Sequence, residues 1–253
     1  MGYLELSKQE LEKEYGNLVK RFEEFKGMGL NLNMARGKPS KEQLDFSLPM
    51  LDTISSKSDF IGEDKMDCRN YGLLNGITEC RKLFADILGV DAENVIVGGS
   101  SSLNMMFDTI SCFMTAPAVE GCKPWYEVKN RKFLCPVPGY DRHFGITQYY
   151  GFELIPIPMD DNGPDMDMVE RLVSEDDSIK GIWCVPKYSN PAGITYSDEV
   201  VKRFAALKPA AKDFRIMWDN AYCIHEISDT PDVLLNIMDE CKKTGNEDLP
   251  ILF

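Results

Sequence analysis

Two segments of this chain place a possible phosphate-binding turn and an aromatic ring directly after apolar stretches. Residues 98–102 read GGSSS and follow the apolar residues 94–97. Backbone amides and hydroxyls in such a turn suit a phosphate, although a flexible turn with a serine cap has the same composition. Tyr140 follows a proline and a glycine after a second apolar stretch, and its ring can stack on a planar ligand or belong to the core. Each segment alone is a weak signal.

Two further segments place an amide and a carboxylate shortly after apolar stretches. Asn190 lies after the largely apolar residues 179–185 and before Pro191, so its backbone is extended and its amide can point at a ligand or form an Asx-type turn. Asp219 follows Trp218, and a carboxylate beside a core is costly unless it is paired or hydrogen-bonded. Together these four groups predict a ligand that is a planar, cationic, phosphorylated heterocycle. A phosphorylated pyridine with a protonated ring nitrogen is such a ligand.

Alternating strands and helices must position these segments. The apolar stretches predicted as strands are residues 94–97, 132–136, 152–157, 179–185, 214–218 and 250–253. Helical spacing predicts helices over residues 78–88, 102–114, 141–150, 166–173, 197–207 and 231–242. This alternation is typical of an α/β fold with a mainly parallel sheet covered by helices on both faces. Ligands bind such sheets at the carboxyl ends of the strands, where all four segments lie.

The first 60 residues are predicted to be distinct from this α/β domain, which we expect over residues 61–253. Ser7 and Glu10 match a capping box, and apolar residues at helical spacing follow them until Gly27 and Gly29 end the helix. Residues 30–67 are rich in proline, serine and charge, which predicts an irregular connecting arm.

Composition and charge argue against several classes of protein. The 253 residues carry a net charge of -13, whereas nucleic-acid binding needs a basic face. The apolar stretches are too short for a membrane span and the N-terminus lacks the pattern of a signal peptide, so we expect a cytoplasmic protein. The eight cysteines form no CxxC pair and there are two histidines, which argues against a zinc site. The P-loop and GxGxxG patterns of nucleotide-binding proteins are also missing from the sequence.

The order of Tyr71, GGSSS, PGY, SNPAG and DNAY resembles the fold type I pyridoxal-phosphate-dependent aminotransferases of class I/II. RGKPS at residues 36–40 and VPKYSNPAGITYS at residues 185–197 are most similar to the branch of bacterial aspartate aminotransferases related to MocR-type regulators. The resemblance implies a PLP-transferase fold whose small domain includes residues 1–60. It further implies a homodimer with pyridoxal 5'-phosphate as cofactor, which transfers an amino group from an amino acid, aspartate in this branch, to a 2-oxo acid such as 2-oxoglutarate.

The resemblance also implies roles around the cofactor ring. Asp219 would pair with the ring nitrogen and keep it protonated, so that the ring can accept electrons. Tyr222 and Asn190 would donate hydrogen bonds to the phenolic oxygen of the ring, and Tyr140 would stack on its face.

Other implied roles concern the phosphate and the substrate. The residues implied for the phosphate are Gly99, Ser100 and Ser101. Tyr71 would reach the phosphate of the neighbouring subunit. Gly37 and Asn190 would line the substrate site, and Arg36 either contacts a substrate carboxylate or lies at the surface.

The family's Schiff-base lysine has no counterpart in this sequence. The resemblance implies an SxSK-type motif after the strand that follows DNAY, and the sequence stops in that predicted strand at Phe253. We therefore expect a truncated chain that is inactive alone. Lys187 lies near Asn190 but does not match the motif. Two alternatives remain open, a cofactor-binding effector domain of a MocR-type regulator and another fold type I enzyme such as a β-lyase.

Overall fold

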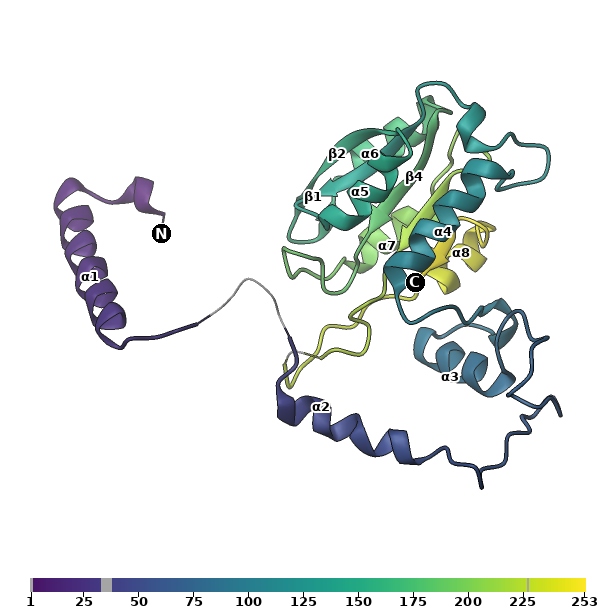
Figure 1. The fold of residues 1–253 in the computed structure, drawn as a ribbon. Coiled ribbons are helices and arrows are strands. Elements are labelled where there is room, and N and C mark those ends of the chain that lie inside the picture. Colours follow the sequence, from purple (N-terminus) through teal and green to yellow (C-terminus); the bar gives the residue numbers. More distant parts are fainter. Residues whose placement is uncertain (1, 33–37, 227) are drawn as a thin grey trace. The chain divides into compact units, whose positions relative to one another are not determined.

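The computed structural model describes residues 2–32, 38–226 and 228–253, and the chain divides into two compact units, Met1–Asp59 and Phe60–Phe253 (Figure 1). Arg36 and Gly37 therefore lie outside the described residues. None of the helices in the described part of the chain is long and apolar enough to cross a membrane.

The first unit contains the predicted helix and a second helix that the sequence analysis missed. α1 (Lys8–Gly27) begins with the predicted capping box, in which the Ser7 amide donates to the Glu10 carboxylate at 2.8 Å. α2 (Lys41–Ser47) continues into a 3-10 turn, Leu48–Asp52, so the prediction of a wholly irregular arm is wrong. A second capping box, from Ser40 and Gln43, starts α2, but the helix is too short to show apolar periodicity.

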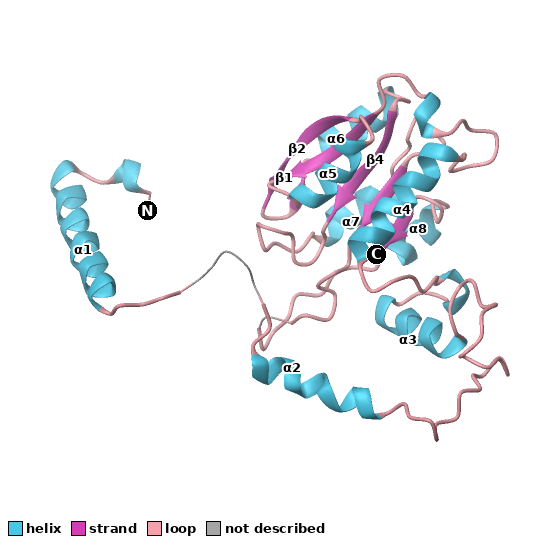
Figure 2. Ribbon diagram, viewed as in Figure 1, coloured by secondary structure: helices cyan, strands magenta, loops and turns pink. Residues whose placement is uncertain are grey.

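The second unit contains a six-stranded sheet in the order β3-β2-β1-β4-β5-β6 (Figure 2). Five strands are parallel: β1 (Lys132–Val137), β2 (Glu153–Asp160), β4 (Ile179–Cys184), β5 (Arg215–Trp218) and β6 (Pro250–Leu252). The short β3 (Gly163–Pro164) is antiparallel to β2 at one edge. The predicted α/β fold with a mainly parallel sheet is confirmed.

Helices cover both faces of this sheet (Figure 1). On one face α4 (Ser102–Thr115) and α5 (Asp141–Tyr149) pack with Phe133 and Trp183. On the other face α6 (Met166–Glu175), α7 (Asp198–Ala205) and α8 (Ile237–Thr244) pack with Leu134 and Ile182. Neighbouring residues of β1 and β4 thus enter opposite cores, which explains why consecutive residues at the centre of these strands are apolar. α3 (Thr78–Leu88) has the predicted bounds.

Two predicted elements differ in the structure. Residues 94–97 form no strand: Asn94 ends a 3-10 turn, Ala92–Asn94, Val95 is buried and Ile96 is 64% exposed. A strand needs a neighbour to bond its backbone, and here a cavity of about 330 Å³ is lined by these residues and by β6. The helix expected over residues 231–242 begins only at Ile237, where the Asn236 side chain caps it.

Candidate active site

Asp219 is the first residue after β5, at the carboxyl-end edge of the parallel sheet. Its amide donates to the Cys184 carbonyl at the end of β4, which continues the ladder by one residue. The side chain is 8% exposed. One carboxylate oxygen accepts the Ala221 amide at 3.0 Å, so the turn that follows β5 fixes the orientation of the carboxylate.

The other carboxylate oxygen of Asp219 faces His143, a residue that the sequence analysis did not propose for the site. His143 Nε2 lies 2.9 Å from Oδ2, but the two groups are not aligned as a hydrogen bond, and this buried nitrogen has no other hydrogen-bond partner among the described residues. The imidazole stacks on Trp183, with ring centroids 4.7 Å apart and 18° between the planes. Trp183 therefore holds the ring against the carboxylate. His143 follows Tyr140, the residue before α5, by three residues, and the two rings lie edge to face with centroids 5.0 Å apart.

The structure brings four of the predicted residues together around one cavity of about 150 Å³. Its lining includes Tyr140, Asn190, Asp219 and Tyr222, with His143 beside them. These residues come from the ends of β1, β4 and β5, which are neighbours in the sheet. An aromatic ring, an amide, a phenol and a carboxylate thus converge on a space that a small planar ligand can enter.

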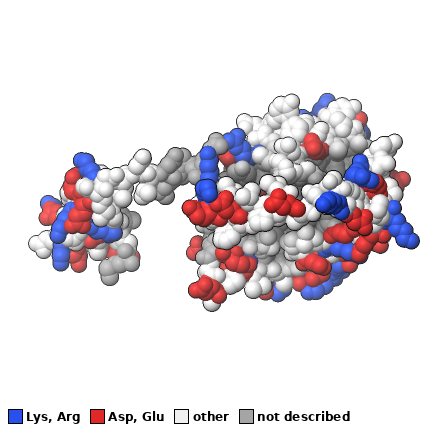
Figure 3. Space-filling view, turned by 60° about the horizontal axis from the view of Figure 1, so that its bottom comes forward, with Lys and Arg blue, Asp and Glu red and all other residues white. Residues whose placement is uncertain are grey.

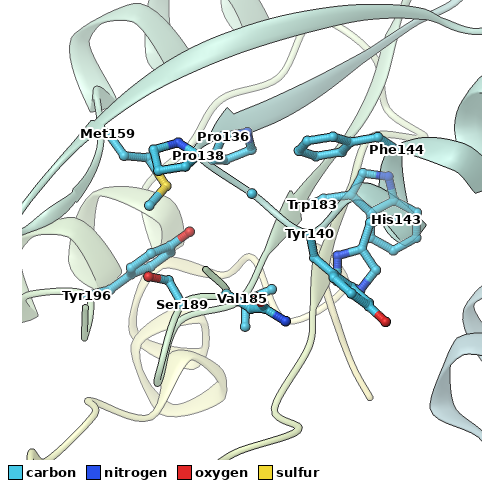
Figure 4. A pocket seen from close by; sticks show the side chains of 12 residues that line it. Pro136, Pro138, Tyr140, His143, Phe144, Met159, Trp183, Val185, Ser189 and Tyr196 are labelled. Carbon is cyan, nitrogen blue, oxygen red and sulfur yellow. The ribbon is translucent and has the colours of Figure 1, made fainter. Parts of the chain in front are cut away.

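A smaller cavity of about 10 Å³, room for about one water molecule, shares Tyr140, His143 and Asn190 with the first. Figure 4 shows Tyr140, His143 and Trp183 on one side of this cavity and Tyr196 on the other. Tyr140 and Asn190 therefore contribute to the walls of both cavities.

The predicted phosphate-binding turn leads into α4. The Ser101 hydroxyl caps this helix by accepting the Asn104 amide at 3.3 Å. Ser102 lines the larger cavity, whereas Gly99 and Ser100 are exposed. A Cβ added at Gly99 would meet no atom within 4 Å, so the described residues leave open space there.

Tyr71 is 92% exposed and does not line the cavity of this chain. Its predicted contact is with another subunit, so its role stays a prediction. The roles of Gly37 and Arg36 also stay predictions, because both lie outside the described residues.

Lys187 is buried, and its ammonium pairs with Glu226. Nζ lies 3.1 and 3.2 Å from the two carboxylate oxygens, and Lys187 is absent from the lining of the larger cavity. Burial raises the pKa of the nearby Cys223 thiol, and the Lys187 charge offsets only part of this effect. Cys223 is therefore a thiol, and not a thiolate nucleophile, at neutral pH.

Charge on the surface is mixed. In Figure 3, acidic and basic side chains alternate over the visible face of the described residues, whereas a nucleic-acid-binding protein gathers its basic side chains on one face.

Comparison with known proteins agrees with this fold. Residues 6–253 match the family model described as aspartate amino-transferase. The chain is 46% identical over 230 residues to an aspartate aminotransferase of Corynebacterium glutamicum, a match that covers 91% of this chain and 53% of that protein.

Solved structures show the same relation. The crystal structure of an aspartate transaminase from C. glutamicum superposes with a TM-score of 0.86 at 42% identity, covering 98% of this chain and 58% of that one. A putative aminotransferase from Corynebacterium diphtheriae gives a TM-score of 0.83 at 44% identity, covering 93% and 57%. The chain spans just over half the length of these relatives. With its parallel sheet, its cavity at the strand ends and these matches, the chain belongs to the aspartate aminotransferase family.

Proposed function

We propose that this protein is a pyridoxal-phosphate-dependent aminotransferase that moves an amino group from an amino acid, aspartate, to a 2-oxo acid such as 2-oxoglutarate. The observation that carries the proposal is the buried Asp219 carboxylate beside His143 in a cavity lined by Tyr140, Asn190 and Tyr222. The comparisons support it, because the curated relative from C. glutamicum is described as an aspartate aminotransferase.

The residues present fit this cofactor. A buried carboxylate needs a positive partner, and the N–H of a protonated pyridine ring supplies one for Asp219. His143 Nε2, which lacks a hydrogen bond among the described residues, adds polarity at the same point. Pyridoxal phosphate, when bound, supplies an electron-accepting ring that stabilises the negative charge left when the amino acid loses its Cα proton.

The chain's own side chains would orient and hold the ring. Tyr222 and Asn190 would donate hydrogen bonds to the ring oxygen, and Tyr140 would cover one ring face and exclude water from it. Asp219, fixed by the Ala221 amide, would keep the proton on the ring nitrogen throughout the reaction.

The phosphate would lie at the start of α4, where free helix amides favour an anion. The residues proposed for it are Gly99, Ser100 and Ser101. We also propose a homodimer in which Tyr71 reaches the partner's phosphate, a role that its 92% exposure on a single chain permits. Gly37 and Arg36 are proposed on the resemblance alone to contact the substrate.

We also propose that none of the lysines in this chain forms the Schiff base. The cavity lining within the described residues includes no lysine, and Lys187 is held by Glu226. Proton transfer at Cα needs a positioned base, so this chain alone should produce no oxaloacetate from aspartate and 2-oxoglutarate. Turnover by the purified chain, free of other enzymes, would refute this part of the proposal.

Cofactor binding tests the main proposal. Pyridoxamine phosphate needs no lysine to bind, and Trp183, which stacks on His143 of the cavity lining, serves as the fluorescent reporter. We expect saturable quenching, and we expect Asp219→Asn to weaken binding about tenfold or more because a charge-assisted hydrogen bond is lost. The proposal fails if the unaltered chain shows no saturable binding, or if Asp219→Asn binds as tightly.

A further inference from the structure

Glu226 joins the two loops that carry Asn190 and Tyr222. Its carboxylate contacts Lys187 Nζ at 3.1 and 3.2 Å and accepts the Tyr188 hydroxyl at 3.2 Å. Lys187 and Tyr188 come shortly before Asn190, after β4, whereas Glu226 comes four residues after Tyr222, beyond β5. A single carboxylate therefore links the backbone on both sides of the cavity.

Burial of Lys187 and Tyr188 makes the contact with the Glu226 carboxylate costly to break. The Lys187 side chain is 7% exposed and Tyr188 is 8% exposed, so both polar groups would lose water without compensation if the carboxylate were absent. Among the described residues, Glu226 is the carboxylate within ion-pair distance of Lys187. The Glu226 side chain is itself 42% exposed, so it retains part of its hydration while it neutralises the buried ammonium.

Short hydrogen-bonded turns connect the link to the cavity. After Tyr188, the Ser189 amide donates to the Ile194 carbonyl at 2.8 Å and the Ile194 amide donates to the Ser189 hydroxyl at 3.1 Å, which closes the loop around Asn190. On the other side, the His225 amide donates to the Tyr222 carbonyl at 3.0 Å. Glu226 is therefore connected through short turns to Asn190 on one side and to Tyr222 on the other.

We propose that Glu226 is a positioning residue that sets this separation, so that Asn190 and Tyr222 can donate to the same oxygen of the cofactor ring. This inference rests on the proposed function. Two donors stabilise one ring oxygen together only when both lie within hydrogen-bond distance, and loss of either favours the protonated form of that oxygen.

The test compares Glu226→Gln with Glu170→Gln as a matched control. The Glu170 side chain is 43% exposed and lies 2.7 Å from Arg203, between α6 and α7, so both substitutions remove one half-exposed carboxylate from an ion pair. Pyridoxamine phosphate affinity is measured by fluorescence titration. The absorption spectrum of the bound cofactor is recorded against pH, and the melting temperature of each ligand-free protein is measured.

We expect Glu226→Gln to weaken binding about tenfold, the effect of weakening one hydrogen bond to a charged group. It should also raise the pKa of the ring hydroxyl in the bound cofactor, whereas Glu170→Gln changes neither property. Because Glu226→Gln leaves a buried ammonium unpaired, a second variant, Lys187→Met with Glu226→Gln, removes both charges and should show the same loss of affinity.

The possible results separate the two proposals. If the unaltered chain does not bind pyridoxamine phosphate, the proposed function fails and this inference fails with it. If the unaltered chain binds, the deciding variant is Glu226→Gln, or the double variant when Glu226→Gln does not fold. The inference is wrong if that variant keeps the affinity within about twofold and leaves the spectrum unchanged, because Glu226 then serves stability alone.

Discussion

The amino ends of β4 and β5 are held by a buried ion pair, and its removal should destabilise the second unit strongly. Lys180 Nζ lies 2.7 Å from Asp213 Oδ1, and the Trp125 indole N–H donates to the other oxygen at 2.9 Å. The side chains of Lys180 and Asp213 are 7% and 5% exposed. Asp213→Asn keeps the shape and an acceptor for Trp125, but it leaves the ammonium buried without a counter-charge.

The structure gives the size of this effect. Removing one partner of a buried pair costs about 3–5 kcal/mol of the free energy of unfolding. The pair between Arg203 and Glu170 has the same 2.7 Å separation, but its side chains are 30% and 43% exposed, and Arg203 also contacts Asp167. Glu170→Gln should therefore cost less than about 1 kcal/mol. Burial, and not distance, distinguishes the two pairs.

Urea denaturation followed by tryptophan fluorescence measures both variants. Lys180→Met combined with Asp213→Asn should recover most of the lost stability, because no unpaired buried charge remains. Equal costs for Asp213→Asn and Glu170→Gln, or no recovery in the double variant, would refute the reasoning. Since this pair lies at the opposite end of the strands from Asp219, pyridoxamine phosphate affinity should not change in the folded protein.

Three further predictions concern the site and its surroundings. His143→Phe keeps a ring against Trp183 but removes the nitrogen that lies 2.9 Å from Asp219. Fluorescence titration should show about tenfold weaker binding of pyridoxamine phosphate. Unchanged affinity would contradict this prediction. Gly139→Ala would place a Cβ 2.3 Å from a backbone carbonyl oxygen, so urea denaturation should show a loss of about 1–3 kcal/mol. Burial raises the pKa of Asp176, but hydrogen bonds from Lys132 and Ser178 have a larger, opposite effect and bring this pKa down to about 2. A carboxyl group with a lowered pKa stabilises the fold above about pH 4, and this stabilisation is lost as the pH falls toward 2. The difference in the free energy of unfolding between the unaltered chain and Asp176→Asn should therefore shrink over that range.

The sheet was predictable from the sequence because its central strands are apolar on both faces. Leu134 and Phe133 enter opposite cores, as do Ile182 and Trp183, so consecutive residues of both strands are apolar in the sequence, with Lys180 near the start of β4 as a charged exception. Since parallel strands align their carboxyl ends, the residues after them were expected to converge, and Tyr140, Asn190 and Asp219 do line one cavity. The roles of these residues toward a cofactor stay predictions.

The features that the sequence did not predict depend on contacts between distant segments. His143 meets Asp219, 76 residues further along the chain, only because α5 packs beside the end of β5. Glu226 gains its importance from a buried lysine 39 residues earlier. Residues 94–97 have a strand-like composition but no strand beside them, and composition alone does not reveal whether a neighbour is present.

The protonation state of the bound ring shows most directly whether Asp219 is the partner of a protonated ring nitrogen. The measurement is the ¹⁵N chemical shift of pyridoxamine phosphate labelled at the ring nitrogen and bound to this chain. We expect a pyridinium shift that persists at pH values where the free ring has lost its proton, and a neutral-pyridine shift with Asp219→Asn. A neutral-pyridine shift in the unaltered chain, or identical shifts in both proteins, would contradict it.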